Sequence, residues 1–341
     1  MKYIEIFVVE IDGGFYYQLG ANYYQTTLAS SLFSLYIRNV EFCKKERGFN
    51  MQHNNKAVVF ILLGQSNAVG HDIPMREEDK IIEPMENVFG LSRDFNQSFE
   101  NTELKWSGYT SFGMNLAEEQ DNTYSLANCL AKLWQDEIDK GNKRNLPDLY
   151  IVHIAIGAQG VTDGYMWNPN YERKLIPGAL GTVDISLTPF TGHILSLLKD
   201  SFDKMGKTFE VMGIHWRGSE NDAIVSREVL MSTGKNIHNE VFNSFCISIG
   251  QNVPIILHRL VCCDRYMDLD PSGVSLNNMH YINKMFGELE AENENISVFD
   301  VRKCPHYIPD VRGNGIFNED VVHYTAETNR WVAEEIFNNY K

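Results

Sequence analysis

An apolar stretch over residues 57–63 ends abruptly at Gly64, and the polar residues Gln65, Ser66 and Asn67 follow at once. A continuous apolar run of this length, without polar alternation, predicts a strand buried on both faces, as in a parallel sheet. In open α/β sheets, ligands bind at the carboxyl ends of such strands. The run therefore predicts a parallel sheet whose functional edge includes Ser66.

Strands and helices alternate along most of the chain. Apolar runs that predict strands lie at residues 57–63, 87–91, 149–156, 209–214, 253–260 and 296–300. Apolar positions at helical spacing predict helices within residues 124–139, 194–202 and 326–340. This alternation favours an α/β fold, with a mostly parallel sheet covered by helices on both faces.

Residues 1–50 differ from the rest of the chain. They mix tyrosine-rich pieces with an apolar patch and a basic cluster, without a strand–turn–helix pattern. Met51, a short polar lead and the first strong strand then follow in the order typical of the start of an α/β domain. We therefore expect the functional domain to span residues 51–341. Two interpretations of residues 1–50 stay open: a poorly packed extension, or an upstream misassignment of the start.

Composition argues against several classes of function. The formal net charge is −15, and no run of Lys and Arg is long enough to follow a phosphate backbone, which disfavours nucleic acids and anionic membranes as partners. The longest apolar run is too short to span a bilayer, and no signal-peptide pattern is seen, so a cytoplasmic location is the default and export by another route stays open. None of the six cysteines forms a C-x-x-C pair, which favours structural thiols over a zinc or redox site.

A serine nucleophile needs a base and hydrogen-bond donors for the oxyanion. Ser66 follows a predicted strand, while Asp320 and His323 stand three residues apart before the last predicted helix. Asp320 could orient the imidazole of His323 so that its other nitrogen takes the proton of Ser66. The competing interpretations are a helix N-cap for Ser66 and ordinary surface roles for the other two residues.

Two further polar clusters follow predicted strands. Residues 215–222 come after the run at 209–214, and the glycine-rich residues 157–162 come after the run at 149–156. Glycines permit close approach of a backbone to a ligand, but the spacing matches neither a dinucleotide fingerprint nor a P-loop. Because these clusters all follow strands of one predicted sheet, we expect them to share one edge and form a site.

Two of the clusters carry motifs of a known family. Gly64-Gln65-Ser66-Asn67 matches a G-Q-S-N block (the first block), and the segment from Asp320 to His323 matches a D-x-x-H block (the fourth block). With them the chain resembles the SGNH hydrolases over residues 56–340, and within that superfamily the sialate O-acetylesterases and the acetylxylan esterases of carbohydrate esterase family six. The resemblance implies a flavodoxin-like three-layer α/β/α sandwich. It also implies a catalytic triad of nucleophile Ser66, base His323 and acid Asp320.

The second block of the family reads G-G-T with a tryptophan a few residues later. Gly160-Val161-Thr162 and Trp167 fit this spacing, although Val161 replaces the second glycine. The resemblance implies that Gly160 supplies an oxyanion N–H, with Gly157 as the alternative.

The third block reads W-x-Q-G-E-x-D-A in relatives. It matches at Trp216, Glu220, Asp222 and Ala223, whereas Gly218 and Ser219 stand where Gln and Gly are usual. The side-chain oxyanion donor is thus missing from its usual place, and Asn221 and Arg217 are the candidate replacements.

The resemblance implies a metal- and cofactor-independent serine esterase that removes O-acetyl groups from a carbohydrate through an acyl-enzyme. The oxyanion would bind the N–H groups of Ser66 and Gly160 and the side chain of Asn221. Candidate substrate-binding residues are Gln65, Asn67, Trp167, Arg217 and Glu220. Two alternatives stay open: a non-catalytic carbohydrate-binding relative with Trp167 and Tyr165 as a stacking platform, and a lipase or thioesterase of the same superfamily. The G-x-S-x-G elbow of the α/β-hydrolases is not matched, because Ala68 stands at its last position.

Overall fold

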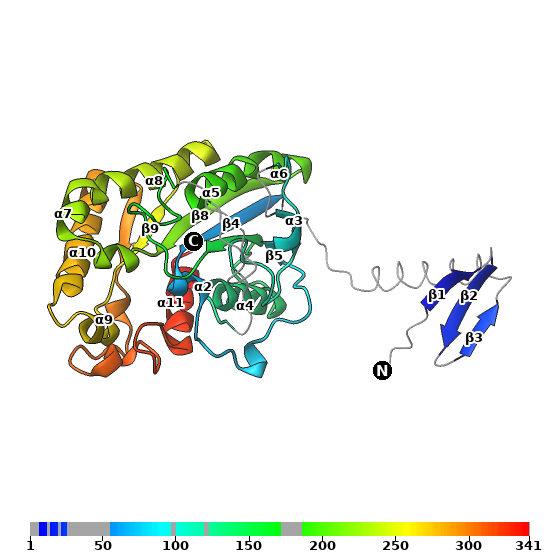
Figure 1. The fold of residues 1–341 in the computed structure, drawn as a ribbon. Helices are drawn as coiled ribbons and strands as arrows, with labels where there is room; N and C mark the ends of the chain where they lie inside the picture. The colour runs from blue at the N-terminus through cyan, green and yellow to red at the C-terminus, as the bar shows by residue number, and fades with distance from the viewer. Residues whose placement is uncertain are drawn as a thin grey trace. The chain divides into compact units, whose positions relative to one another are not determined.

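The computed structural model describes residues 7–11, 14–19, 22–25, 55–96, 100–118, 123–171 and 186–340 (Figure 1). The chain divides into two compact units, Met1–His53 and Asn54–Lys341, and each is described by itself. Much of residues 1–50 lies outside the described residues, so the interpretation of this segment stays a prediction. Within the described part of the chain, no helix combines the length and the apolar character needed to cross a bilayer.

The first unit contains a three-stranded antiparallel sheet in the order β1-β2-β3. Its strands are β1 (Phe7–Ile11), β2 (Gly14–Leu19) and β3 (Asn22–Gln25). The sequence analysis did not predict these strands, because it looked for strands joined to helices. The segments are nevertheless rich in Val, Phe and Tyr, which fit a pleated strand well.

The second unit is built on a seven-stranded sheet in the order β10-β9-β8-β4-β7-β5-β6. Its strands are β4 (Lys56–Gly64), β5 (Val88–Leu91), β6 (Trp106–Gly108), β7 (Asp148–Ala155), β8 (Thr208–Arg217), β9 (Ile255–His258) and β10 (Ile296–Phe299). All neighbours pair in parallel except β5 and β6. The six apolar runs thus predicted six strands of this sheet correctly, and within it the three-residue edge strand β6 was missed.

Helices connect these strands. Their bounds are α2 (Ser66–Val69), α3 (Arg93–Asn96), α4 (Leu126–Asp139), α5 (Leu187–Ser196), α6 (Leu198–Lys204), α7 (Arg227–Val229), α8 (Lys235–Ile249), α9 (Asp264–Leu269), α10 (Val274–Glu292) and α11 (Ala326–Asn339). The helices predicted within 124–139, 194–202 and 326–340 correspond to α4, to α5 with α6, and to α11. The predicted mixed α/β class with a mostly parallel sheet is confirmed.

The central strand β4 is buried on both sides. Ala57, Val59, Ile61 and Leu63 pack into an apolar cluster with residues of α5, α6, α8 and α10. Val58, Phe60 and Leu62 pack into a second cluster with residues of α4 and α11. Burial of every side chain from 57 to 63 explains the continuous apolar run, since neither face of the strand meets solvent.

The last residue of β4 must be glycine. Gly64 has φ +143°, and a Cβ built on it would lie 1.9 Å from the carbonyl oxygen of Arg217 at the end of β8. The next N–H, that of Gln65, donates to the same oxygen at 2.9 Å. A side chain at position 64 would therefore separate β4 from β8 at the point where the chain turns towards Ser66.

Candidate active site

Ser66 is the first residue of α2, directly beyond the carboxyl end of the central strand. Its side chain is half-buried. The N–H groups of Ala68 and Val69 both donate to Gln65 O, which closes a tight turn behind the serine. Among the described residues, no acceptor takes the N–H of Ser66 itself, so this donor is free to bind a ligand.

The fourth block folds into a tight loop in which Asp320 and His323 meet. Nδ1 of His323 lies 2.5 Å from Oδ2 of Asp320, while Oδ1 of Asp320 accepts the N–H groups of Val322 at 2.8 Å and His323 at 2.9 Å. Burial alone would raise the pKa of Asp320, but these hydrogen bonds lower it overall. Val321 has φ +55°, a left-handed conformation that is rare and strained for a β-branched residue.

Asn67 joins the first block to the fourth. Its Nδ2 donates to Val322 O at 3.3 Å, and its Oδ1 accepts the N–H of Tyr324 at 3.1 Å. Val322 and Tyr324 are the two neighbours of His323, while Asn67 follows Ser66 in the chain. One buried side chain thus places the serine turn beside the histidine loop, across 257 positions of sequence.

Glu220 of the third block supports the same turn. It is 8% exposed and accepts Gln65 Nε2 at 2.8 Å and Asn67 Nδ2 at 3.2 Å. Burial raises the pKa of Glu220. Gln65 and Asn67 are also buried, with 2% of each exposed. These three side chains therefore bind one another behind Ser66, which is inconsistent with the direct substrate contacts expected for them.

Asp222 holds the second block in place. Its fully buried carboxylate accepts Val161 N at 3.0 Å, Thr162 N at 2.9 Å and Thr162 Oγ at 2.8 Å. A Cβ built on Gly160 would lie 2.4 Å from Asp222 Oδ1, so the block approaches Asp222 as closely as only glycine allows. Among the described residues, no acceptor takes the N–H of Gly160.

Asp222→Ala is expected to lower the free energy of unfolding by roughly 3 kcal/mol or more. The substitution leaves three buried donors unpaired, and each such group costs about 1–3 kcal/mol. Urea unfolding measures the loss, and Asp200→Ala, at an exposed position of α6, is the matched control. Equal stability of the two variants would contradict this account of Asp222.

Trp167 lies in the core, contrary to the expectation of a substrate contact. Its indole is fully buried, donates from Nε1 to Gly64 O at 3.0 Å, and packs edge-on against Trp216 with ring centroids 5.1 Å apart. A stacking platform for a sugar requires an exposed ring face, so this role is wrong for Trp167. Tyr165 is half-exposed, and its hydroxyl donates to Asn221 O at 3.3 Å.

Arg217 is also buried rather than open to substrate. Its Nη1 donates to Asn329 Oδ1 at 2.6 Å and to Asn67 O at 3.2 Å, and its guanidinium lies 4.8 Å from the ring centroid of Tyr324. Burial lowers the pKa of Arg217 from its ordinary value. These contacts are inconsistent with the substrate-binding and oxyanion roles considered for Arg217.

The altered positions of the third block have a structural explanation. Ser219, where relatives have glycine, adopts φ +84°, and its Oγ lies 3.2 Å from Trp216 Nε1. A Cβ on Gly218, where relatives have glutamine, would lie 3.0 Å from the Trp216 ring. The packing of Trp216 thus crowds position 218. Asn221, which is half-buried and begins a 3₁₀ turn at Asn221–Ile224, remains the candidate side-chain donor.

Sequence reasoning missed a second carboxylate at His323. Asp72 Oδ2 lies 3.3 Å from Nδ1 of His323. This is the same nitrogen that Asp320 contacts, although the two aspartates are far apart in the sequence. The side-chain nitrogen and carboxylate oxygens of these three residues lie within 4.8 Å of one another. The available signal was proximity, since Asp72 stands six positions after Ser66.

A second histidine–carboxylate pair lies next to the fourth block. His71 Nε2 is 2.9 Å from Glu118, which also accepts Gly157 N at 2.7 Å, and the imidazole centroids of His71 and His323 are 6.0 Å apart. The hydrogen bond to Glu118 raises the pKa of His71. Gly157, the alternative oxyanion donor, therefore has its N–H bonded to Glu118. No motif around Glu118 signals this pairing.

Comparison with known proteins gives a likeness in structure. No family model and no curated protein matches the sequence. The solved structure of NanS aligns with a TM-score of 0.53 at 14% identity, covering 84% of this chain and 98% of NanS. TesA aligns with a TM-score of 0.40 at 9% identity, covering 83% of this chain and 98% of TesA. At this identity the likeness to NanS concerns the fold alone, and it agrees with the mixed α/β fold that the sequence predicts.

Proposed function

We propose that this protein is a serine esterase of the SGNH type that removes O-acetyl groups from a carbohydrate. The observation that carries the proposal is the bridge made by Asn67, which holds the Ser66 turn against the two neighbours of His323. A nucleophile and a histidine–carboxylate pair held side by side are what acyl transfer requires.

In this proposal the histidine loop sets the direction of proton transfer. Asp320, kept ionised by its hydrogen bonds, accepts the Nδ1–H of His323, so Nε2 carries the lone pair that takes the Ser66 proton. Ser66 Oγ attacks the ester carbonyl, and the protonated imidazole then gives its proton to the departing sugar oxygen. Water, activated by the same imidazole, hydrolyses the acyl-serine and restores the enzyme.

The proposed oxyanion hole consists of the N–H groups of Ser66 and Gly160 with the side-chain amide of Asn221. Neither N–H group has an acceptor in the part of the chain that the structure describes, which supports their role. Asn221 is supported by its place between Glu220 and Asp222, which bind the first and second blocks. Preorganised donors of this kind act on charge that develops only in the transition state.

The proposal of an acetylated carbohydrate as the substrate rests on the resemblance of the motifs. The proposed three-layer flavodoxin-like arrangement rests on the same resemblance, and the apolar clusters on both faces of β4 support it.

Hydrolysis of nitrophenyl acetate, butyrate and octanoate, followed by acetate release from a panel of acetylated glycans, tests the proposal. We expect the acetyl ester to have the highest kcat/KM and acetate to be released from at least one glycan. A preference for octanoate would favour the lipase or thioesterase alternative. A folded protein that hydrolyses none of the esters would favour the non-catalytic carbohydrate-binding alternative. Because Trp167 is buried, that alternative lacks the stacking platform expected for it.

Gly160→Ala is expected to lower kcat by about 10²–10³, with a smaller change in KM, because losing one oxyanion donor costs this much. The added Cβ would displace the block from Asp222, since it would lie 2.4 Å from Oδ1. Gly287→Ala in α10, where an added Cβ meets no atom within 4 Å, is the control. A kcat for Gly160→Ala within threefold of the control would remove Gly160 from the oxyanion hole.

A further inference from the structure

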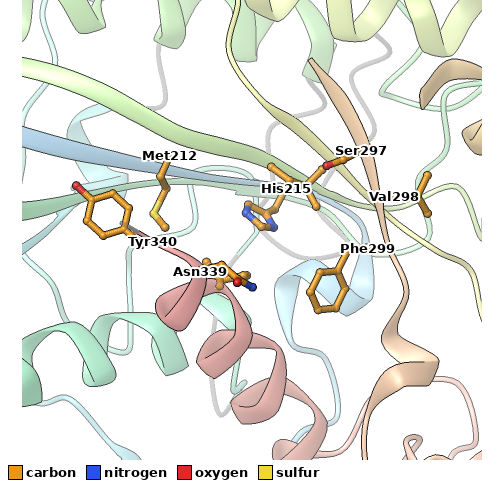
Figure 2. A pocket seen from close by; sticks show the side chains of 9 residues that line it. Met212, His215, Ser297, Val298, Phe299, Asn339 and Tyr340 are labelled. Carbon is orange, nitrogen blue, oxygen red and sulfur yellow. The ribbon is translucent and has the colours of Figure 1, made fainter. Parts of the chain in front are cut away.

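A cavity of about 360 Å³ opens on the face of the sheet that packs against α11. Its floor is β8, with Met212 and His215, one wall is β10, with Val298 and Phe299, and Tyr340 beyond α11 lies at its end (Figure 2). The volume is in the range of small-molecule sites. Its lining contains none of the residues assigned to ester hydrolysis, so the cavity is separate from the proposed active site.

The floor of the cavity carries one imidazole. The rest of the lining is mixed, with the apolar residues Met212, Ile256, Val298, Phe299 and Ile336 and the polar residues Ser297, Asn339 and Tyr340. His215 is 4% exposed, and Figure 2 shows its imidazole between the side chains of Met212 and Phe299. Among the described residues, its Nε2 has no hydrogen-bond partner. Sequence analysis singled out the cluster that begins at His215, and the proposed mechanism leaves this residue without a role.

Hydrogen bonds behind His215 fix which nitrogen carries its proton. Arg217 Nε lies 3.5 Å from His258 Nδ1, and His258 Nε2 lies 3.1 Å from His215 Nδ1. Arginine can only donate, so His258 Nδ1 accepts, and the neutral His258 must carry its proton on Nε2. His258 donates that proton to His215 Nδ1, which therefore acts as an acceptor. The neutral His215 then carries its own proton on Nε2, the nitrogen that faces away from His258. Burial and the charge of Arg217 lower the pKa of His215 to about 3, so it stays neutral.

The guanidinium of Arg217 at the end of these hydrogen bonds has no carboxylate in direct contact, and Glu220 attracts it from a greater distance. The hydrogen-bond acceptors of Arg217 Nη1 are the neutral Asn67 O and Asn329 Oδ1, and Nη2 is buried without a partner among the described residues. Among the described residues, no carboxylate oxygen lies within 4.0 Å of this guanidinium. The aligned imidazoles extend its positive potential towards the cavity, which favours an anionic acceptor at His215 Nε2.

We infer that this cavity is a second binding site, for a small carboxylate with an apolar tail. The carboxylate accepts the Nε2–H of His215, and the tail packs against Met212, Ile256 and Phe299. The hydroxyl of Tyr340 does not compete as a donor, because it donates to Glu210 at 2.6 Å, and Glu210 is itself paired with Lys56 at 2.8 Å. A carboxylate suits these apolar walls better than a phosphate, which is more strongly hydrated and carries more charge.

Titration of ¹⁵N-labelled protein with hexanoate tests the inference, with hexan-1-ol as the uncharged probe of equal chain length. We expect a saturable shift of the His215 Nε2 resonance with hexanoate, and binding at least tenfold weaker with hexan-1-ol. The same titration of Ser66→Ala should give the same affinity, so the result does not depend on ester hydrolysis. Absence of a saturable shift, or equal affinity for the two probes, would overturn the inference.

Two variants locate the bound hexanoate. His215→Phe keeps the ring and removes the donor, and Ser297→Trp fills the cavity from an exposed position of the edge strand β10, on the same face as Phe299. Each should weaken hexanoate binding at least tenfold, whereas Val229→Trp, on α7 outside the cavity, should not. If His215→Phe does not fold, Ser297→Trp alone decides. Unchanged affinity in the folded cavity variants would place hexanoate elsewhere and overturn the assignment.

Discussion

Ser66→Ala should lower kcat for acetyl-ester hydrolysis by about 10⁴–10⁶, the usual cost of removing a triad nucleophile. The fold should persist, because Ser66 is half-buried and its side chain makes no contact on which the turn depends. Nitrophenyl acetate kinetics measure the loss. Ser232→Ala, at an exposed position away from the turn, is the control.

Covalent labelling gives an independent measurement for the same residue. A fluorophosphonate should modify the wild-type protein at Ser66 and leave Ser66→Ala unlabelled, as peptide mapping by mass spectrometry would report. Full esterase activity in Ser66→Ala, or stoichiometric labelling at another serine, would refute the proposed nucleophile.

His323→Ala should reduce kcat about as much as Ser66→Ala, and the double variant should be no worse than either single one. Residues that act as one unit are strongly non-additive, because neither is useful without the other. His280→Ala, at an exposed position on α10, controls for loss of an imidazole. Multiplicative losses in the double variant would mean that Ser66 and His323 act in separate steps.

Asp320→Ala should lower kcat less than Ser66→Ala or His323→Ala does. Asp72 Oδ2 lies only 3.3 Å from the same imidazole nitrogen and can still accept its proton. Activity that falls further in Asp320→Ala with Asp72→Ala than in Asp320→Ala alone would identify Asp72 as the partial substitute.

The strands of the main sheet were predictable because burial on both faces leaves a direct mark on sequence. The run at 57–63 is apolar at each position, and each of those side chains is buried. The placement of Ser66 and Gly160 beyond one edge of the sheet followed from the same logic, since β4 and β7 are parallel neighbours that end together. The sheet order, with β4 in the centre, left no comparable mark, because it depends on contacts between distant segments.

Side-chain direction at the strand ends was the main failure. Trp167 and Arg217 stand in blocks that approach the site, yet one donates to Gly64 O and the other to Asn329. Motif spacing places a residue near an edge but does not say on which side of a turn its side chain lies. Glu118 and Asp72 were missed for the complementary reason, because their partners are set by tertiary packing rather than by local pattern.

The central position of β4 affects how the chain folds during synthesis. This strand leaves the ribosome before either of its partners, β7 and β8, which follow much later in the chain. At about 5–20 residues per second, the delay is on the order of ten seconds. During that interval a strongly apolar strand has both edges unpaired, which makes it a target for chaperones and for aggregation. The His323 loop is made long after Ser66, so for much of synthesis the growing chain holds the serine without its base.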